Sequence, residues 1–420
     1  MRCREPSLRQ SNLIRPSYAE SFRCLGSACE ETCCQGWNIH IDKATFDKYQ
    51  ALPAGPLASL IQISVKAVDP AATPANLAAF AFINVSPATG CPLQSEDHLC
   101  RVHSELGEAF LSPICASFPR RTQAVDGLDE TTVSLACPEA ARQVLLNTQL
   151  VLSAPAAQTV AWDDSASGNR DMTAYFWPIR QFGLNLILDR SYPLWQRLFL
   201  LGGFCQCLDA VARGEEGCDF PTLLLEFSET IGSGSLRTAM QRLPADPAVQ
   251  LNLSMRLLKL CLGNLWMSAS VADTIKDFRN GIGLNADSSF QSHLAGYAAA
   301  YQDFYAPFFL LHQEILENYL VDFIFRELFP FGRIVSAAES TFDASKAFTL
   351  LAARLVLIKS LLVGVAGAHK QAFSTEHVVH TIQSVSRHFE HNSKFFDQAY
   401  ELLTANNLLS LPALTTLLRN

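Results

Sequence analysis

The sequence predicts a mainly α-helical protein in which a cysteine-rich α+β N-terminal domain precedes an irregular α-helical domain. Hydrophobic residues make up 49% of the 420 residues and charged residues 17%, a balance typical of a globular protein with a well-buried core. Eight of the thirteen cysteines lie between residues 24 and 137. Beyond residue 172, almost every segment repeats its apolar residues at the spacing of an α-helix.

Two domains are expected because 420 residues exceed the usual size of one hydrophobic core. We place the cysteine-rich domain at residues 1–150 and the mainly helical domain at residues 172–420. The segment 151–171 is expected to connect them, since it has the composition of a loop. No self-similar period of about 20–50 residues is visible, so a solenoid is not expected.

The first domain is expected to combine short helices and strands. Asp42 is placed to cap a helix from Lys43 to Leu52. Residues 53–79, rich in Ala and Pro, are expected to form a loop with one short apolar segment. The remaining expected elements are a strand over 79–85, a hairpin over 90–100, a helix over 101–111, a strand over 131–135 and a helix from Pro138 to Leu150.

The second domain is expected to consist of helices separated by Gly and Pro. Apolar residues recur three and four positions apart within each of these segments, as on the buried face of a helix. The expected helices are 172–189, 192–213, 220–231, 235–242, 247–268, 289–304, 307–328, 344–368, 375–391 and 393–406.

Charge and hydropathy limit the classes of partner. The net charge of −8 disfavours non-specific binding to nucleic acid or to an anionic membrane. The N-terminus is polar and lacks the apolar segment of a secretory signal. The most apolar stretch, 347–367, contains Arg354 and Lys359, so we expect a buried helix and no membrane insertion. We therefore expect a cytoplasmic protein, where thiols stay reduced and a disulfide framework is disfavoured.

The clustered cysteines indicate a metal centre. Their irregular spacing fits an iron–sulfur cluster better than paired zinc knuckles, because four thiolates need only converge on one cluster. Eight thiols would suffice for two four-thiolate centres, and adjacent Cys33 and Cys34 do not easily reach the same one. Zinc, redox thiols and buried structural cysteine remain alternatives, and burial is the expectation for Cys205, Cys207, Cys218 and Cys261. The candidate ligands are Cys24, Cys29, Cys33, Cys34, Cys91, Cys100, Cys115 and Cys137.

Other familiar site motifs are weak or missing in the sequence. Gly281-Ile-Gly283 is a lone glycine pair with no convincing strand before it. The sequence contains no Walker loop and no Gly-x-Ser-x-Gly elbow. Histidines recur at helical steps near the C-terminus, and without a thiol or carboxylate clearly placed beside them we expect a solvated helix face. These histidines are His377, His380, His388 and His391.

Several motifs resemble those of the flagellin lysine N-methylase family. The resemblance is densest in residues 22–42 and 91–139 and thinner elsewhere, but its motifs follow the family order along most of the chain. The matching residues are the run from Phe22 to Asp42, Cys91-Pro-Leu, Glu96-Asp-His-Leu-Cys100-Arg, Leu106-Gly107, Leu111-Ser112, Cys115, Phe118-Pro119-Arg120, Ser134 to Glu139, Leu316-Glu-Asn-Tyr319 and Phe329-Pro-Phe331.

The resemblance implies a bacterial cytoplasmic enzyme that transfers methyl groups from S-adenosylmethionine to surface lysines of flagellin. It also implies a 4Fe-4S cluster held by cysteines of the shared motif, without deciding which four bind. Radical S-adenosylmethionine enzymes typically use Cys-x3-Cys-x2-Cys, and here Gly36 stands where the third cysteine would fall. Polar displacement by a neutral amine needs no radical, so the cluster would hold the cofactor or be structural.

Lysine methylation requires a deprotonated amine, whereas free lysine has a pKa of roughly 10.4. A nearby carboxylate or tyrosine is therefore expected, and the candidates are Asp42, Glu317 and Tyr319. Glu96 and Asp97 are further candidates for the same role, although a solvated turn fits both better. Candidate contacts to the cofactor are Arg120, Arg121 and Trp37.

Two other functional classes stay open at this point. One is a zinc- or cluster-stabilised binding protein without catalysis. The other is an iron–sulfur redox or metal-handling protein, because short cysteine runs also occur in small metal-binding families. Metal content distinguishes zinc from a cluster, and methylation of added flagellin distinguishes catalysis from binding.

Overall fold

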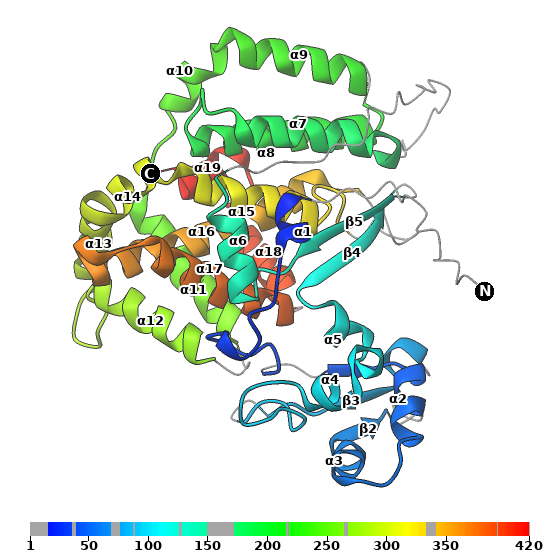
Figure 1. The fold of residues 1–420 in the computed structure, drawn as a ribbon. Coiled ribbons are helices and arrows are strands. Elements are labelled where there is room, and N and C mark those ends of the chain that lie inside the picture. Colours follow the sequence, from blue (N-terminus) through cyan, green and yellow to red (C-terminus); the bar gives the residue numbers. More distant parts are fainter. Residues whose placement is uncertain are drawn as a thin grey trace.

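The computed structural model describes residues 16–35, 39–68, 76–86, 89–125, 128–148, 172–215, 217, 219–263, 268–332, 342–392 and 394–419. The described chain is mainly α-helical, as predicted, with a large helical body and a smaller lobe beside it (Figure 1). Each part has its own buried hydrophobic cluster.

The large body contains the helices predicted beyond residue 172. Helices α12 and α19 were not predicted, and the predicted helix 307–328 divides into α14 and α15 at His312, whose backbone leaves the helical conformation. The helices are α7 (Phe176–Leu188), α8 (Leu194–Ala212), α9 (Phe220–Ser233), α10 (Ser235–Gln241), α11 (Pro247–Leu262), α12 (Ala269–Gly281), α13 (Phe290–Ala300), α14 (Ala306–Leu311), α15 (Gln313–Arg326), α16 (Ala344–His369), α17 (Thr375–His391), α18 (Phe395–Ala405) and α19 (Leu411–Leu418).

Helix α16 lies at the centre of this body. Together with the following turn, it is long and apolar enough to cross a membrane by length and composition, but 94% of its most apolar window is buried inside the protein. The prediction of a buried core helix is therefore confirmed. Helix α12 packs closely on α16 because Gly281 faces Gly364; a Cβ on Gly281 would overlap the Gly364 carbonyl oxygen. Glycines thus let the two backbones approach.

The smaller lobe surrounds a three-stranded antiparallel sheet in the order β1-β3-β2. Asp42 caps α2 as predicted, because its carboxylate accepts the Thr45 N–H at 3.0 Å. The predicted loop over 53–79 was wrong in part: Leu57, Ala58 and Ile61 share a buried face, and the chain forms α3 there. The elements are β1 (Ile39–Ile41), α2 (Lys43–Gln50), α3 (Pro56–Ser64), β2 (Val65–Ala67), β3 (Ala81–Ile83), α4 (Arg101–Leu106) and α5 (Pro113–Ser117).

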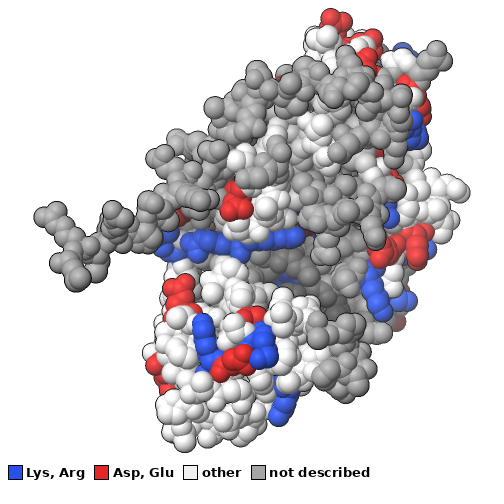
Figure 2. All heavy atoms as spheres, turned by 90° about the vertical axis from the view of Figure 1, so that its right-hand side faces the viewer, with Lys and Arg blue, Asp and Glu red and all other residues white. Residues whose placement is uncertain are grey.

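The rest of the N-terminal region packs on the large body. It comprises α1 (Ser17–Ser21), the antiparallel hairpin of β4 (Arg120–Val125) and β5 (Leu128–Val133), and α6 (Pro138–Leu145). The buried residues of the small core lie between Ile39 and Val102, whereas these segments contribute to the large core. The buried clusters therefore group α1, β4, β5 and α6 with the large body, whereas the predicted boundary near residue 150 would place them in the first domain. The predicted connection 151–171 lies outside the described residues. Figure 2 shows a row of Lys and Arg atoms above a hollow between the upper and lower parts of the view.

Candidate functional site

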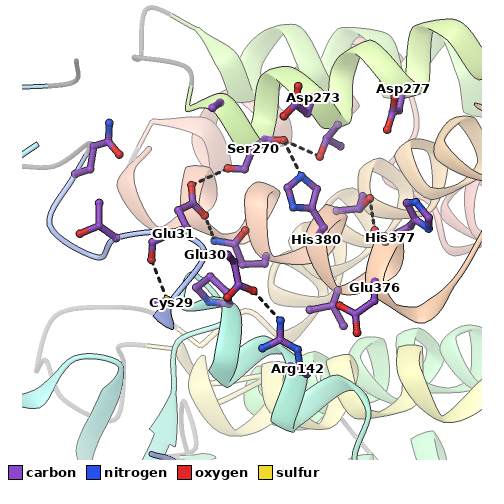
Figure 3. Close-up of a pocket in the computed structure, with 18 of the residues that line it drawn as sticks. Cys29, Glu30, Glu31, Arg142, Ser270, Asp273, Asp277, Glu376, His377 and His380 are labelled. Atoms are coloured by element: carbon purple, nitrogen blue, oxygen red, sulfur yellow. Dashed lines mark hydrogen bonds and ion pairs between the residues drawn. The ribbon is translucent and has the colours of Figure 1, made fainter. Parts of the chain in front are cut away.

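A pocket of about 960 Å³ lies between the cysteine run and the helical body. Its walls come from residues 26–35, the start of α6, and the helices α12 and α17 (Figure 3). The volume is that of a site for a cofactor-sized ligand. Segments more than 200 residues apart in sequence therefore form one cavity.

The lining of this pocket is acidic. It contains five carboxylates, and Arg142 is the one Lys or Arg among the residues that line it. Arg142 is itself committed to Glu30 at 2.7 Å and to Glu139 at 2.5 Å. Because Arg142 neutralises Glu30 and Arg387 neutralises Glu31, the carboxylates that favour a cationic ligand are Asp273, Asp277 and Glu376. The lining carboxylates are Glu30, Glu31, Asp273, Asp277 and Glu376.

Histidines from α17 form part of the wall. The His380 Nε2 lies 3.2 Å from the carbonyl oxygen of Ser270, and because a carbonyl only accepts, Nε2 carries the proton. The Nδ1 of His380 is then a proton acceptor. His377 accepts the Ser374 N–H at Nδ1, and burial together with nearby His369 lowers the pKa of His377.

The expectation of a solvated histidine face on α17 was wrong in part. His388 is buried, and His377 and His380 line the pocket. The side chain of His391 lies outside the described set. The partner of His380 comes from α12, a helix that the sequence did not predict. Helical spacing predicts that these histidines share one face of α17, but the sequence does not indicate that α12 forms the opposite wall of the pocket.

The thiols of the cysteine run meet thiols from residues 91–137. Cys34, Cys91, Cys100 and Cys115 all lie in or against the small core, and the Cys91 N–H donates to the Cys34 carbonyl at 2.8 Å. Cys137 packs instead against the large core. Cysteines from residues 91–137 thus lie beside the cysteine run.

Electrostatic contacts divide the thiols into two overlapping groups. Cys91 and Cys115 interact with each other and with Cys100, and both reach Cys34. Cys137 interacts with Cys29 and Cys33, and Cys29 also interacts with Cys24. Cys33 lies between the groups, and its sulfur is 4.0 Å from that of Cys34.

The pKa values of these thiols depend mainly on burial and on each other. Burial raises the pKa of Cys91 and of Cys115 to about 11 and that of Cys137 to about 12. The contact between the Cys33 and Cys34 thiols lowers the pKa of Cys33 and raises that of Cys34. Metal binding at the buried thiols must displace their protons.

The donor set fits a metal centre by its chemistry. All eight cysteines of the two groups are free thiols. Within the described ranges, no three His, Cys, Asp or Glu side chains are close enough together to surround a single ion. Thiolate sulfur is a ligand of zinc and of iron–sulfur clusters alike, so the chemistry of the donor set fits either.

The three predicted catalytic residues do not meet. Glu317 is buried in α15, where Arg197 binds one carboxylate oxygen at 2.8 Å and Arg190 the other at 2.6 Å. Tyr319 is also buried, and burial raises its pKa. Asp42 caps α2 in the small lobe. None of the three lines the large pocket.

The two predicted cofactor contacts that the structure describes are also absent from the pocket lining. Arg120 and Arg121 are exposed neighbours at the start of β4, and Arg120 donates to the Phe22 carbonyl at 2.9 Å. Arg121 lies near Glu327, whose pKa it helps to lower. Trp37 lies outside the described residues. Glu96 and Asp97 are exposed in a turn, as predicted.

The fold and the pocket define a helical protein with a thiol-rich lobe beside an acidic cavity of cofactor size. The family model of the FliB lysine N-methylase C-terminal domain matches residues 180–417. Because that match covers more than half of the 420 residues, the chain belongs to the FliB lysine N-methylase family. The family predicted from the sequence motifs is confirmed.

Characterised relatives place the chain beside flagellar proteins. It is 32% identical over 170 residues to the flagellar biosynthetic protein FliU of Salmonella muenchen, covering 40% of this chain and 94% of FliU. It is 34% identical over 139 residues to the lysine-N-methylases of Salmonella typhimurium and Salmonella choleraesuis, covering 33% of this chain and 33% of each relative. No solved structure matches the chain.

Proposed function

We propose that this protein is an S-adenosylmethionine-dependent protein-lysine N-methyltransferase that acts in the acidic pocket, with flagellin as its substrate. Membership of the FliB lysine N-methylase family supports the reaction class. The names of the FliU and lysine-N-methylase relatives support a flagellar context and a lysine acceptor. The observation that carries the proposal is the pocket itself, about 960 Å³ in volume and lined by five carboxylates.

The acidic lining matches the charge of both reactants. S-adenosylmethionine supplies an electrophilic methyl group on a sulfonium, which a neutral amine takes by displacement, leaving the thioether. A substrate lysine also arrives as a cation, so the carboxylates of the pocket attract both molecules. Asp273 and Asp277, one helical turn apart on α12, face the cavity opposite the cysteine run (Figure 3).

His380 is proposed as the acceptor of the lysine proton. Its Nε2–H is held by the Ser270 carbonyl, which leaves Nδ1 to take a proton from an ammonium group in the pocket. Glu30 interacts electrostatically with His380 and would stabilise the imidazolium that forms. Removing the proton is necessary because free lysine, with a pKa of roughly 10.4, is cationic at neutral pH.

The thiol groups are proposed to hold a 4Fe-4S cluster. Thiolate sulfur is the ligand that iron–sulfur clusters use; within the described structure the eight candidate cysteines form no disulfide, and Cys34, Cys91, Cys100 and Cys115 lie in or against the small core. Cys29 lines the pocket, so a cluster at these thiols borders the cavity. Such a cluster would supply a Lewis-acidic iron near the cofactor or a structural link.

Methylation of purified flagellin tests the proposed reaction. Anaerobically prepared protein should add methyl groups to flagellin lysines when S-adenosylmethionine is present, as measured by mass spectrometry of the digested substrate. His380→Ala should lower kcat about 100-fold or more, the usual contribution of a general base. His103→Ala is the matched control, because His103 is an exposed histidine on α4 outside the pocket lining.

Two outcomes would contradict the proposal. Cluster-replete protein that leaves flagellin unmethylated would favour a binding or redox protein. Full activity of His380→Ala, with His103→Ala also unchanged, would remove His380 from the reaction but not the reaction from the pocket. Iron and sulfide analysis of the same preparation tests the cluster separately, since stoichiometric zinc without sulfide would replace it with a zinc site.

A further inference from the structure

The segment from Cys29 to Gln35 belongs to the thiol groups and to the pocket at once. Its cysteines meet the thiols of residues 91–137, while Glu30, Glu31 and Thr32 line the cavity. Any change in the backbone of this short segment therefore moves a thiol and a pocket wall together. What holds the segment in place consequently affects both sites.

Arg387 of α17 holds the segment by its backbone. Its guanidinium donates to the carbonyl of Thr32 at 3.1 Å and to that of Gln35 at 2.5 Å. These two carbonyls flank Cys33 and Cys34 in the sequence. Arg387 is buried and also pairs with Glu31 at 2.8 Å, so one side chain fixes three points of the segment.

Glu31 ties the same segment to two helices of the large body. Gln383 of α17 donates to one of its carboxylate oxygens at 2.7 Å, and Ser270 of α12 donates to the other at 2.8 Å. Gln383 is buried and also donates to the Ala136 carbonyl at 2.9 Å, immediately before Cys137. The hydrogen bond from Ser270 to Glu31 is visible in Figure 3.

A separate contact ties the segment to the small lobe. Gln94 donates to the Thr32 hydroxyl at 2.8 Å, and the N–H of Cys34 donates to the same oxygen at 3.1 Å. The segment is therefore held by α17 and α12 on one side and by the Cys91–Cys100 turn on the other. Drawing the thiols together around a metal must act on this shared backbone.

We infer that Arg387 and Gln383 are positioning residues through which metal binding at the thiols and ligand binding in the pocket are coupled. The inference rests on the proposed function for the nature of the two ligands, but the hydrogen bonds that carry it are independent of catalysis. Hydrogen-bonding partners outside the ligand shell commonly change metal affinity by about 10- to 100-fold. Coupling between two binding equilibria is reciprocal in free energy, so a pocket ligand whose binding is favoured by the metal must in turn raise the metal affinity, and we expect the tighter binding to slow metal loss.

The rate of metal release to an external chelator tests the coupling in the full-length, metal-loaded protein. Arg387→Gln should release metal about tenfold faster than the wild type. S-adenosylhomocysteine, used as the pocket probe, should slow release from the wild type about fivefold or more and have little effect on Arg387→Gln. Arg387→Lys should fall between them, because lysine keeps the charge but its single nitrogen cannot bind the two carbonyls and the Glu31 carboxylate as the two guanidinium nitrogens do.

Arg197→Met is the matched control for lost stability. Arg197 is likewise buried and likewise binds a carboxylate, that of Glu317, and a backbone carbonyl, that of Ile187, but it lies on α8 outside the pocket lining. Its replacement should lower stability without uncoupling the probe from metal release. Hydrogen exchange of residues 29–35 should speed up in Arg387→Gln and not in the control.

Three outcomes separate the inference from the proposed function. Wild-type release rates in Arg387→Gln, or equal acceleration in Arg197→Met, would overturn the inference and leave the proposed function standing. Metal retention that ignores S-adenosylhomocysteine, although titration shows that it binds, would do the same. A chain that holds no metal and binds no S-adenosylhomocysteine would overturn both.

Discussion

Lys359 allows a quantitative test of the core, because its amine is buried without a carboxylate partner in the described structure. It lies on α16 and donates to the Leu418 carbonyl at 3.1 Å, while the ring of Tyr301 lies 5.9 Å from the nitrogen. Burial lowers the pKa of Lys359 from 10.5 to about 7. At about 1.4 kcal/mol for each tenfold change in proton affinity, this corresponds to about 5 kcal/mol.

The direction of the pH dependence of stability follows from whether the folded or the unfolded chain binds the proton. Between pH 7 and 10.5 the unfolded chain keeps Lys359 protonated while the folded chain does not, so the free energy of unfolding rises with pH. At pH 7, Lys359→Met removes about 4 kcal/mol of this penalty and loses about 1–3 kcal/mol by leaving the Leu418 carbonyl unpaired. The variant should therefore be more stable than the wild type at pH 7 and no more stable near pH 10.

Urea unfolding of both proteins at several pH values between 7 and 10 measures this difference. Comparing the two proteins cancels the other titrating groups, since only residue 359 differs. Lys259→Met is the control, because Lys259 is exposed on α11 and should leave the pH dependence unchanged. Wild-type and Lys359→Met stabilities that stay parallel across this range would refute the reasoning, because they would show that the folded protein keeps Lys359 charged.

Three further predictions test other parts of the structure. Glu317→Gln should cost about 3–5 kcal/mol of stability by leaving a buried arginine unpaired, with kcat per folded molecule retained; lost kcat at unchanged stability would restore Glu317 as a catalytic residue. Gly364→Ala should cost about 1–3 kcal/mol by pushing α12 from α16, whereas Gly232→Ala, which meets no neighbouring atom, should not lower thermal stability. Cys115→Ser should lower the bound iron measured by elemental analysis, and Cys261→Ala should not.

The sequence was sufficient for the thiol-rich region because thiols are chemically distinctive. Eight cysteines in one part of the chain indicated a common site, and the structure brings Cys91 and Cys115 to the cysteine run. Helical periodicity likewise placed most elements of the large body, including α16 and α17. Both signals come from composition or from local spacing, so they can be recognised without knowing the tertiary contacts.

The pocket had no such signal, because its walls consist of ordinary residues that only tertiary packing brings together. Ser270 lies on a helix that the sequence did not predict, and Gln383 is 352 positions from the Glu31 side chain that it binds. Glu317 is predicted to be catalytic because it is a carboxylate in a family motif, but in the structure it pairs with buried Arg197 and exposed Arg190. The motif therefore identifies the family, whereas the catalytic role of Glu317 stays a prediction.

The cysteine run shows both what the sequence reveals and what only the three-dimensional structure reveals. Its thiols are recognisable in sequence, whereas the purpose of the residues between them is visible only in space. Glu31 and Thr32 separate cysteines in the sequence and receive hydrogen bonds from α17 and Gln94 in the structure. Spacing between metal ligands is usually read as the geometry that the metal needs. Here the intervening residues also build the wall of a neighbouring pocket, so for the proposed cluster the spacing of the cysteines must satisfy two sites, which is a physical reason for its irregularity.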